Sequence, residues 1–179
     1  LEAIGERVSP GEYKKVPLSA GIPDHVLGDV HVVNYNDLES VRWVMEKYDI
    51  AVVITEPILQ NIGIVKPQAG YLQGLRDLCT EQGVVLVFDE VKTGFRHAIG
   101  GYQSICNVMP DLSVFGKAIA NGFPVSCLAG RGDVMDLFAD RVMHGGTYNA
   151  QPASMAAVIA TLTELAKEDT VDLLIKQGT

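Results

Sequence analysis

Two ionisable residues stand where two apolar runs of the sequence end. Asp89 directly follows the run 84–88, and Lys117 follows the run 112–115 after a single glycine. Runs of this length that are rich in β-branched and aromatic residues are typical of buried parallel strands. Open α/β sheets bind ligands beyond the carboxyl ends of such strands. A carboxylate and a lysine at one sheet edge are the minimum that is needed to hold a pyridine-type cofactor and bond it covalently.

The pattern around Asp89 also fits another class of protein. An apolar strand that ends in Asp-Glu describes the Walker B strand of P-loop nucleotide triphosphatases, where the aspartate holds Mg²⁺. That interpretation requires an upstream GxxxxGK[ST] loop, and the sequence has none. Its one Gly-Lys pair, Gly116-Lys117, lies downstream and is followed by Ala118, which has no hydroxyl for a metal. The nucleotide-binding interpretation is therefore weak, whereas a structural N-cap remains as good an explanation of Asp89 alone.

Lys117 lies in an unusual context for a lysine. A lone lysine is almost always a solvated surface group. Here it stands between an apolar run and Ala118-Ile119-Ala120. Such a site would desolvate the ammonium and lower its pKa, and the free amine could then attack an aldehyde to form a Schiff base. With Asp89 nearby, the functional interpretation is favoured.

A polar cluster follows a third apolar run, 50–55. Glu56-Pro57 ends that run, and Asn61 lies four residues further on. Pro57 alone would explain the end of a strand. The cluster could equally line a ligand pocket at the same edge as Asp89, and the spacing favours neither interpretation.

A glycine-rich turn precedes the Ala-rich segment 152–167. Gly145, Gly146 and Thr147 could offer backbone N–H groups and a hydroxyl to a phosphate. An ordinary turn before a helix explains the same residues, and on spacing alone it is the better explanation.

The composition limits the possible classes of function. The 179 residues suffice for one domain with a sizeable core, and 47% of them are hydrophobic, which argues against a disordered chain. The net charge of −8 argues against a nucleic-acid partner, and no apolar run could span a membrane. Three cysteines without paired spacing indicate free thiols, so we expect a cytoplasmic protein. No histidine has metal-ligand spacing, so no metal is expected.

The elements that must position these residues alternate along the chain. Asn36 with Glu39 predicts a capping box and a helix that ends near Tyr48, and Gly83 is well placed to end a second helix. Strands and helices in alternation predict a parallel sheet with helical crossovers. The expected strands are 29–33, 50–55, 84–88, 112–115 and 125–129, and the expected helices are 36–48, 69–82, 133–139 and 152–167. The expected loops are 1–28, 145–148 and a long one at 92–109 with one helical turn.

Taken together, these segments resemble the class III pyridoxal-phosphate aminotransferases of fold type I, and within them the branch of glutamate-1-semialdehyde 2,1-aminomutase. The resemblance covers about residues 30–165 in order. It implies an α/β fold, with a three-layer α/β/α, mostly parallel sheet that forms part of the large domain. The motifs that carry it are Thr55-Glu56-Pro57, Asn61-Ile62-Gly63, 87–91, Thr93-Gly94-Phe95-Arg96, Pro110-Asp111-Leu112, 116–124 and Gly146-Thr147.

The resemblance implies roles for three residues at the centre of the site. Lys117 would form the Schiff base with pyridoxal 5′-phosphate and would move a proton between substrate and cofactor. Asp89 would keep the pyridine nitrogen protonated, which makes the ring an electron sink. Val91 would pack on one face of the ring.

The resemblance also implies a periphery for the site. Asn61 and Glu56 would lie near the phenolic oxygen and the substrate. Thr147, with Gly146, would reach the phosphate of the cofactor that is bound in the neighbouring subunit of a homodimer. The small-molecule partners would be an amino donor and a keto acceptor.

The chain departs from the family pattern in what it lacks. Family members are more than twice as long, and the upstream phosphate loop, the aromatic residue that stacks on the ring and the small C-terminal domain are missing. We therefore expect a loop-rich segment at 1–28, a partial cofactor-binding domain at 29–168 and the start of a truncated segment at 169–179. The expected activity is intermolecular amino transfer. Intramolecular transfer by an aminomutase and an inactive truncated domain remain the alternatives.

Overall fold

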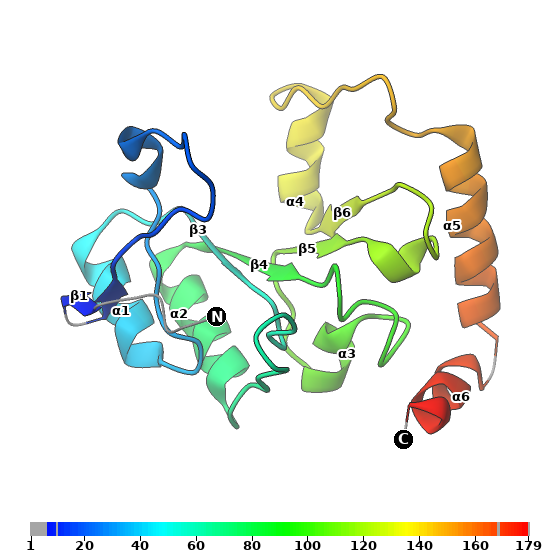
Figure 1. The fold of residues 1–179 in the computed structure, drawn as a ribbon, viewed down its shortest axis with the longest axis horizontal. Coiled ribbons are helices and arrows are strands. Elements are labelled where there is room, and N and C mark those ends of the chain that lie inside the picture. Colours follow the sequence, from blue (N-terminus) through cyan, green and yellow to red (C-terminus); the bar gives the residue numbers. More distant parts are fainter. Residues whose placement is uncertain (1–6, 10, 168, 179) are drawn as a thin grey trace. The chain divides into compact units, whose positions relative to one another are not determined.

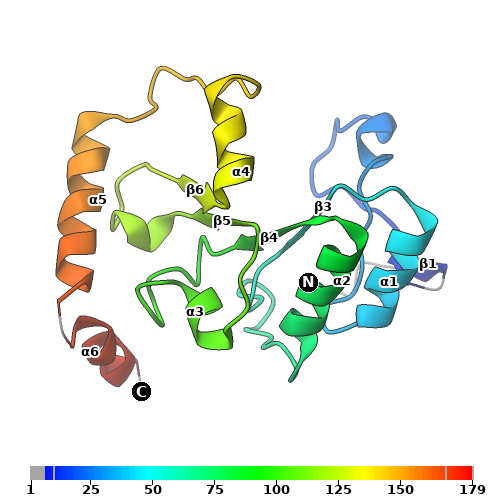
Figure 2. The same cartoon turned by 180° about the vertical axis from the view of Figure 1, so that it is seen from behind.

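The computed structural model describes residues 7–9, 11–167 and 169–178. The chain divides into two compact units. The first contains Leu1–Ala51 and Pro67–Val84, and the second contains Val52–Lys66 and Val85–Thr179. Figures 1 and 2 show the elements of both units from opposite sides.

Two amphipathic helices make up most of the first unit. They contact each other, and each buries apolar side chains at a spacing of three or four residues, such as Val41 and Val44 on one helix and Leu72 and Leu75 on the other. Gly83 ends the second helix with a left-handed backbone, as expected. The elements of this unit are β1 (Arg7–Ser9), β2 (Glu12–Tyr13), the 3₁₀ helix η1 (Asp24–Leu27), α1 (Leu38–Lys47) and α2 (Tyr71–Gln82).

The start of the first helix differs from the expectation. Asp37, and not Asn36, is the N-cap, and its carboxylate accepts a hydrogen bond from the Ser40 N–H at 3.0 Å. Asn36 has a left-handed backbone with φ 64°, and its Oδ1 accepts a hydrogen bond from the Gln68 N–H at 2.8 Å. Asparagine tolerates this conformation better than most residues, so it makes the preceding turn and leaves the cap to aspartate.

The prediction of a strand at residues 29–33 is also wrong. This segment has no strand in the structure, although the Val32 carbonyl accepts one hydrogen bond from the Tyr13 N–H at 3.0 Å. A short apolar segment forms a strand only where a neighbouring strand continues the ladder, and one bond does not make a ladder.

The second unit is built on a four-stranded sheet with the order β3-β4-β5-β6. The first three strands are parallel, and β6 runs antiparallel to β5, so the expected α/β class with a mostly parallel sheet is confirmed. The register places Thr55 beside Phe88 and Asp89 beside Val114, so the carboxyl ends of the three parallel strands meet at one edge. The strands are β3 (Val52–Thr55), β4 (Val85–Asp89), β5 (Leu112–Phe115) and β6 (Cys127–Gly130).

A small apolar cluster lies next to this edge. Phe115, Ile119 and Ala120 are buried, and side chains from the loop after β4, from β6 and from the long helix near the carboxyl end of the chain pack against them. No helix in the described part of the chain is long and apolar enough to cross a membrane. The helices of this unit are α3 (Tyr102–Cys106), η2 (Lys117–Ile119), α4 (Gly132–Met135), η3 (Asp136–Ala139), α5 (Pro152–Leu165) and α6 (Thr170–Gln177).

Candidate active site at the strand ends

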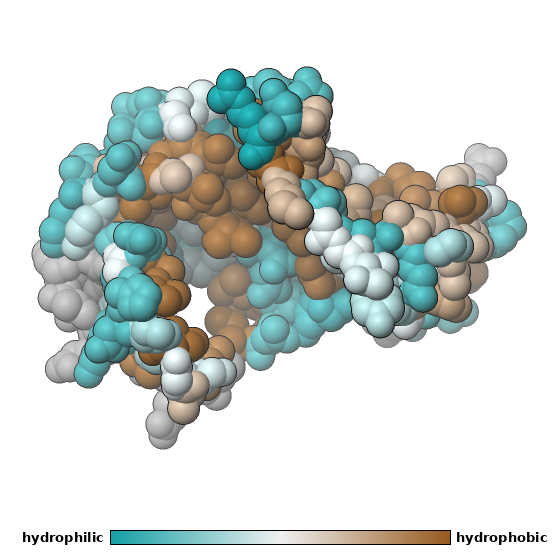
Figure 3. Space-filling model, turned by 90° about the horizontal axis from the view of Figure 1, so that it is seen from above, coloured by the Kyte–Doolittle hydropathy of each residue, from teal (hydrophilic) through white to brown (hydrophobic). Residues whose placement is uncertain are grey.

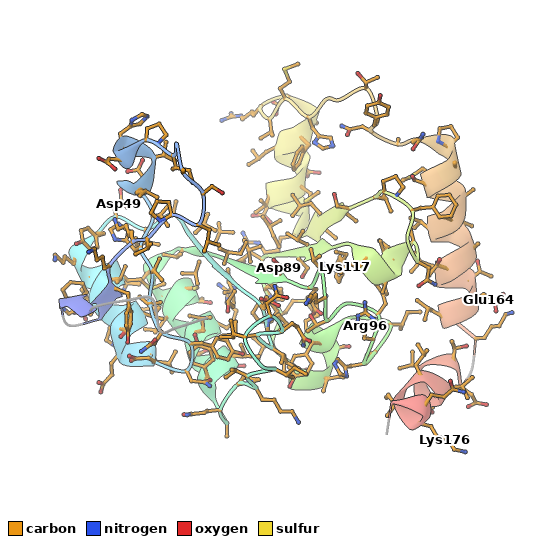
Figure 4. All side chains as sticks on the ribbon, viewed as in Figure 1. Asp49, Asp89, Arg96, Lys117, Glu164 and Lys176 are labelled. Carbon is orange, nitrogen blue, oxygen red and sulfur yellow. The ribbon has the colours of Figure 1, made fainter. Side chains whose placement is uncertain are left out.

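Asp89 is the last residue of β4, and it presents a carboxylate at the edge where the parallel strands end (Figure 4). The side chain is half-buried. Its Oδ1 accepts a hydrogen bond from the Val91 N–H at 3.0 Å, which fixes the direction of the carboxylate. Oδ2 has no partner among the described residues. Asp89 therefore offers one oriented oxygen to a ligand.

Lys117 follows β5 after Gly116 and opens the single turn η2. Its backbone is left-handed with φ 45°, a conformation that costs on the order of 1–3 kcal/mol for a residue with a side chain and that often marks a functional site. The Ile119 N–H donates to the Gly116 carbonyl at 3.1 Å, and the buried Ile119 and Ala120 anchor the turn. The local fold therefore holds the strained lysine in place.

The surroundings of the Lys117 ammonium differ from the expectation. The side chain is exposed, because the apolar neighbours Ile119 and Ala120 turn into the cluster with Phe115 and do not cover the lysine. Nζ has no hydrogen-bond or ion-pair partner in the described ranges. The structure thus leaves the Lys117 side chain exposed at the sheet edge, without the apolar surroundings that were expected.

Val91 connects these two strand ends. Its side chain is half-buried, and a Cβ added to Gly116 would lie 3.4 Å from Val91 Cγ1. The valine therefore packs over the glycine that immediately precedes Lys117. The ends of β4 and β5, which are paired in the sheet, are thus also in contact beyond the strands.

Asn61 and Glu56 occupy the loop after β3. Glu56 is half-buried, and its Oε2 accepts a weak hydrogen bond from the Gln60 N–H at 3.3 Å. The exposed Asn61 accepts a hydrogen bond through Oδ1 from Nζ of Lys92, which lies in the loop after β4. Because an ammonium can only donate, Oδ1 must be the acceptor, and the Asn61 Nδ2 group is left as a donor for a ligand.

Gly146 and Thr147 are not part of this constellation. Both are exposed, and the Gly146 carbonyl accepts a hydrogen bond from the Asn149 N–H at 3.0 Å. Neither residue forms a hydrogen bond with the strand-end residues in the part of the chain that the structure describes. No hydrogen bond between described residues therefore links these two residues to the strand-end groups.

Sequence reasoning did not assign a role to Glu90, which is 0% exposed. Its Oε2 accepts hydrogen bonds from Thr93 Oγ1 at 2.8 Å and the Tyr102 N–H at 2.9 Å, and its Oε1 accepts one from the Gln103 N–H at 3.0 Å. A carboxylate beside Asp89 was visible in the sequence, and the alternation of strand side chains could have placed the two on opposite faces.

Asp111 is a second buried carboxylate without a role from sequence reasoning. Its Oδ2 accepts a hydrogen bond from the Leu86 N–H at 2.7 Å, and its Oδ1 pairs with Arg131 Nη1 at 2.7 Å. The hydrogen bonds from Arg131 to Asp133 and Asp111 raise the guanidinium pKa above its ordinary value. The Arg131 contact lowers the pKa of Asp133 below its usual range. This network fixes the two strands that carry Asp89 and Lys117.

The described residues include no group of three or more His, Cys, Asp or Glu side chains that could hold a metal ion. The chemistry of the strand ends rests instead on one oriented carboxylate oxygen, one free primary amine and one amide donor.

The chain is similar to known proteins along most of its length. The family of class III aminotransferases matches residues 5–177. A glutamate-1-semialdehyde 2,1-aminomutase from Saccharolobus islandicus (strain L.S.2.15 / Lassen #1) is 45% identical over 159 residues, which are 88% of this chain and 37% of that protein. The chain therefore spans well under half of the length of this relative.

Two solved structures share the fold. An omega-transaminase from Sphaerobacter thermophilus has a TM-score of 0.82 and 34% identity, over 87% of this chain and 38% of that one. The FumI protein of Sphingopyxis sp. MTA144, in its PLP internal aldimine form, has a TM-score of 0.84 and 31% identity, over 90% of this chain and 40% of that one. The fold is that of part of a fold type I transferase.

Proposed function

Because the chain belongs to the class III aminotransferases, we propose that it supplies the covalent and electronic part of a pyridoxal 5′-phosphate site. The complete enzyme would move an amino group from an amino acid or amine to a keto or aldehyde acceptor. The observation that carries this proposal is a pair of groups at two adjacent strand ends, Asp89 Oδ2 and Lys117 Nζ, neither of which has a partner among the described residues.

The donor set fits this cofactor. Pyridoxal phosphate has an aldehyde that needs an amine, a ring nitrogen that needs a carboxylate when protonated and a phenolic oxygen that accepts a hydrogen bond. Lys117 Nζ, Asp89 Oδ2 and Asn61 Nδ2 match these three needs in kind. When bound, the cofactor supplies an electron sink for negative charge on the substrate carbon.

Each residue would contribute one physical task. Asp89 would hold a proton at the ring nitrogen, because an anionic oxygen at hydrogen-bond distance favours the charged pyridinium. Lys117 would bind the cofactor through Nζ and, once displaced by the amino donor, would take a proton from the substrate and return it. Val91 would restrict the ring from one side, and Glu56 would face the substrate.

We propose that the enzyme is a homodimer in which each chain supplies phosphate contacts to the cofactor of the other. Gly146 and Thr147 would reach the cofactor phosphate of a second copy. Met143 and Tyr148, close to them in sequence, are 98% and 82% exposed, and Ile159 in α5 is 67% exposed. Figure 3 shows hydrophobic residues among polar ones on the face that it draws. Apolar surface of this kind favours association. We expect the isolated chain to be an oligomer that binds the cofactor weakly, and light scattering during a cofactor titration tests both points.

The organisation of the complete enzyme is also a proposal. The chain spans 37% of its aminomutase relative. This supports a partial large domain at 29–168, preceded by the segment 1–28 and followed at 169–179 by the start of a further segment. The acidic composition and three cysteines that form no disulfide support a cytoplasmic enzyme with small-molecule substrates and without a nucleic-acid partner.

A second candidate is an aminomutase, because the relative that is 45% identical carries that name. It would use the same residues but would retain the intermediate until the amino group returns at another carbon. Incubating the complete enzyme with an amino donor and no acceptor separates the candidates. Free keto product in a 1:1 ratio to sites supports the aminotransferase, and an isomer of the substrate supports the aminomutase. An inactive domain would give neither product and would stay colourless with the cofactor.

A further inference from the structure

Glu90 is a buried carboxylate that the proposed chemistry does not use. Its carboxylate accepts hydrogen bonds from three described residues of the connection between β4 and β5, namely Thr93 and, in α3, Tyr102 and Gln103. A buried carboxylate is costly unless it is well paired, and these donors pair it. Building on the proposed function, we propose that Glu90 is a positioning residue that holds Asp89 and Lys117 in the mutual geometry required by one ligand.

The first connection runs from Glu90 to Asp89. Glu90 directly follows Asp89, which is the last residue of β4. The Glu90 N–H donates to the Val114 carbonyl at 2.9 Å, which extends the ladder beyond the pairing of Asp89 with Val114. The Gly94 N–H donates to the Glu90 carbonyl at 2.8 Å and closes the turn that contains Val91. Glu90 is thus fixed through its backbone and its side chain, and it fixes the Asp89–Val91 turn.

The second connection runs from Glu90 to the strand before Lys117. The carboxylate accepts from the Gln103 N–H, and the Gln103 side chain in turn accepts a hydrogen bond from Ser113 Oγ at 3.0 Å. Ser113 is buried within β5, four residues before Lys117. A continuous chain of hydrogen bonds therefore links the end of β4 to β5 through one carboxylate.

Two glycines in the connection between β4 and β5 lie directly against Glu90. A Cβ on Gly101 would lie 2.6 Å from Glu90 Oε1, and Gly101 also has a positive φ of 77°. A Cβ on Gly94 would lie 2.7 Å from the Glu90 carbonyl oxygen. Only a residue without a side chain fits at either position. Gly101 makes room for the buried carboxylate, and Gly94 makes room for the Glu90 carbonyl, so the geometry of this segment accommodates Glu90.

Glu90→Gln keeps the size of the side chain and replaces one acceptor oxygen with a donor group. An amide oxygen can still accept from Thr93 and Tyr102, but the amide nitrogen then faces the Gln103 N–H, and two donors repel each other. We expect hydrogen exchange in the chain without cofactor to rise about tenfold at Gln103. It should also rise at Val91 and Ile119, whose N–H groups hold the Asp89 and Lys117 turns.

The second measurement follows the ligand itself. Pyridoxal phosphate is added to the chain, borohydride traps the lysine adducts, and peptide mapping gives the ratio of adduct on Lys117 to adduct on Lys92. In Glu90→Gln this ratio should fall at least about threefold, in the range of couplings through such networks. Gln103→Met should lower it in the same direction, since it removes the link to Ser113 and the Nε2 contact with the Gly100 carbonyl but keeps the Gln103 N–H on Glu90.

Leu75→Ala is the matched control, because Leu75 is 1% exposed in α2 and lies outside the strand-end site. It should raise exchange broadly and leave the adduct ratio unchanged, so a general loss of stability is distinguished from lost positioning. Exchange in Glu90→Gln that rises only at Tyr102 and Gln103, with an unchanged ratio, would overturn the inference. If the parent chain shows no preference for Lys117, the exchange at Val91 and Ile119 decides the role of Glu90, and adduct mapping in the complete enzyme decides the proposed function.

Discussion

The ends of β4 and β5 and the segment 143–150 belong to the same unit, but they differ in burial and in hydrogen bonding. At the strand ends, buried carboxylates on Glu90 and Asp111 tie the backbone together, and these contacts orient Asp89. Every residue of 143–150 is exposed. We infer that this chain fixes the proposed covalent and electronic part of the site through its own contacts. The proposed phosphate contacts would depend on a partner at the exposed segment.

The largest effect should come from Asp89→Asn in the complete enzyme. The change removes the anionic oxygen that holds the pyridinium proton, so kcat should fall by about 10²–10³-fold, as for other preorganised electrostatic groups. Cofactor affinity should be partly retained, because Lys117 and the phosphate contacts remain. Steady-state kinetics with Asp133→Asn as the control measures this, and near-normal turnover would show that Asp89 is structural.

Asp111→Ala should reduce the stability of the fold, although Asp111 is not among the residues proposed to contact the cofactor. It leaves the Leu86 N–H buried without an acceptor, which costs about 1–3 kcal/mol in the free energy of unfolding. Urea unfolding of the chain gives this difference. Asp133→Ala removes only an exposed partner of Arg131 and should be close to neutral. Equal losses in the two variants would contradict the special role of the buried contact at the strand ends.

A smaller effect should appear at acid pH. The Arg131 contact lowers the folded-state pKa of Asp133, so its stabilisation is present above the pKa of the unfolded carboxyl and is lost as the pH falls through the folded value. The loss should be slight, because both side chains are exposed. Acid titrations of unfolding for the parent chain and Asp133→Asn should converge at the lowest pH, and a persistent difference there would argue against this ion pair.

Thr147→Val should have the smallest effect on stability, within about 0.5 kcal/mol, because the side chain is exposed. In the assembled enzyme the same variant should weaken cofactor binding, since the lost hydroxyl would contact the phosphate. Thermal unfolding of the chain and cofactor titration of the enzyme measure the two effects. A large stability loss, or unchanged affinity, would remove the contrast between the two regions.

The sequence predicts those parts of the fold that depend on local pattern. The runs 84–88 and 112–115 are strands to within one residue of β4 and β5, and the helix before Gly83 is confirmed. The choice between Asn36 and Asp37 as a cap could not be made from sequence, because it depends on a hydrogen bond from the distant Gln68.

The candidate site likewise has residues that the sequence pattern predicts and residues that it does not. Strand-end placement predicted Asp89 and Lys117, since a residue after an apolar run has a known position in a parallel sheet. The burial of Glu90 and Asp111 depends on partners up to 25 positions away, such as Leu86 for Asp111, and no local pattern reports such contacts. The exposure of Lys117 likewise depends on where Ile119 and Ala120 pack.

The most direct test of the account is the position of the covalent bond. Pyridoxal phosphate is bound to the complete enzyme, reduced with borohydride, and located by peptide mass mapping, with Lys117→Arg as the control. The account predicts the pyridoxyl group on Lys117 and no adduct in the variant. An adduct on Lys92, which lies in the neighbouring loop beside Asn61, or an enzyme without any adduct would contradict it.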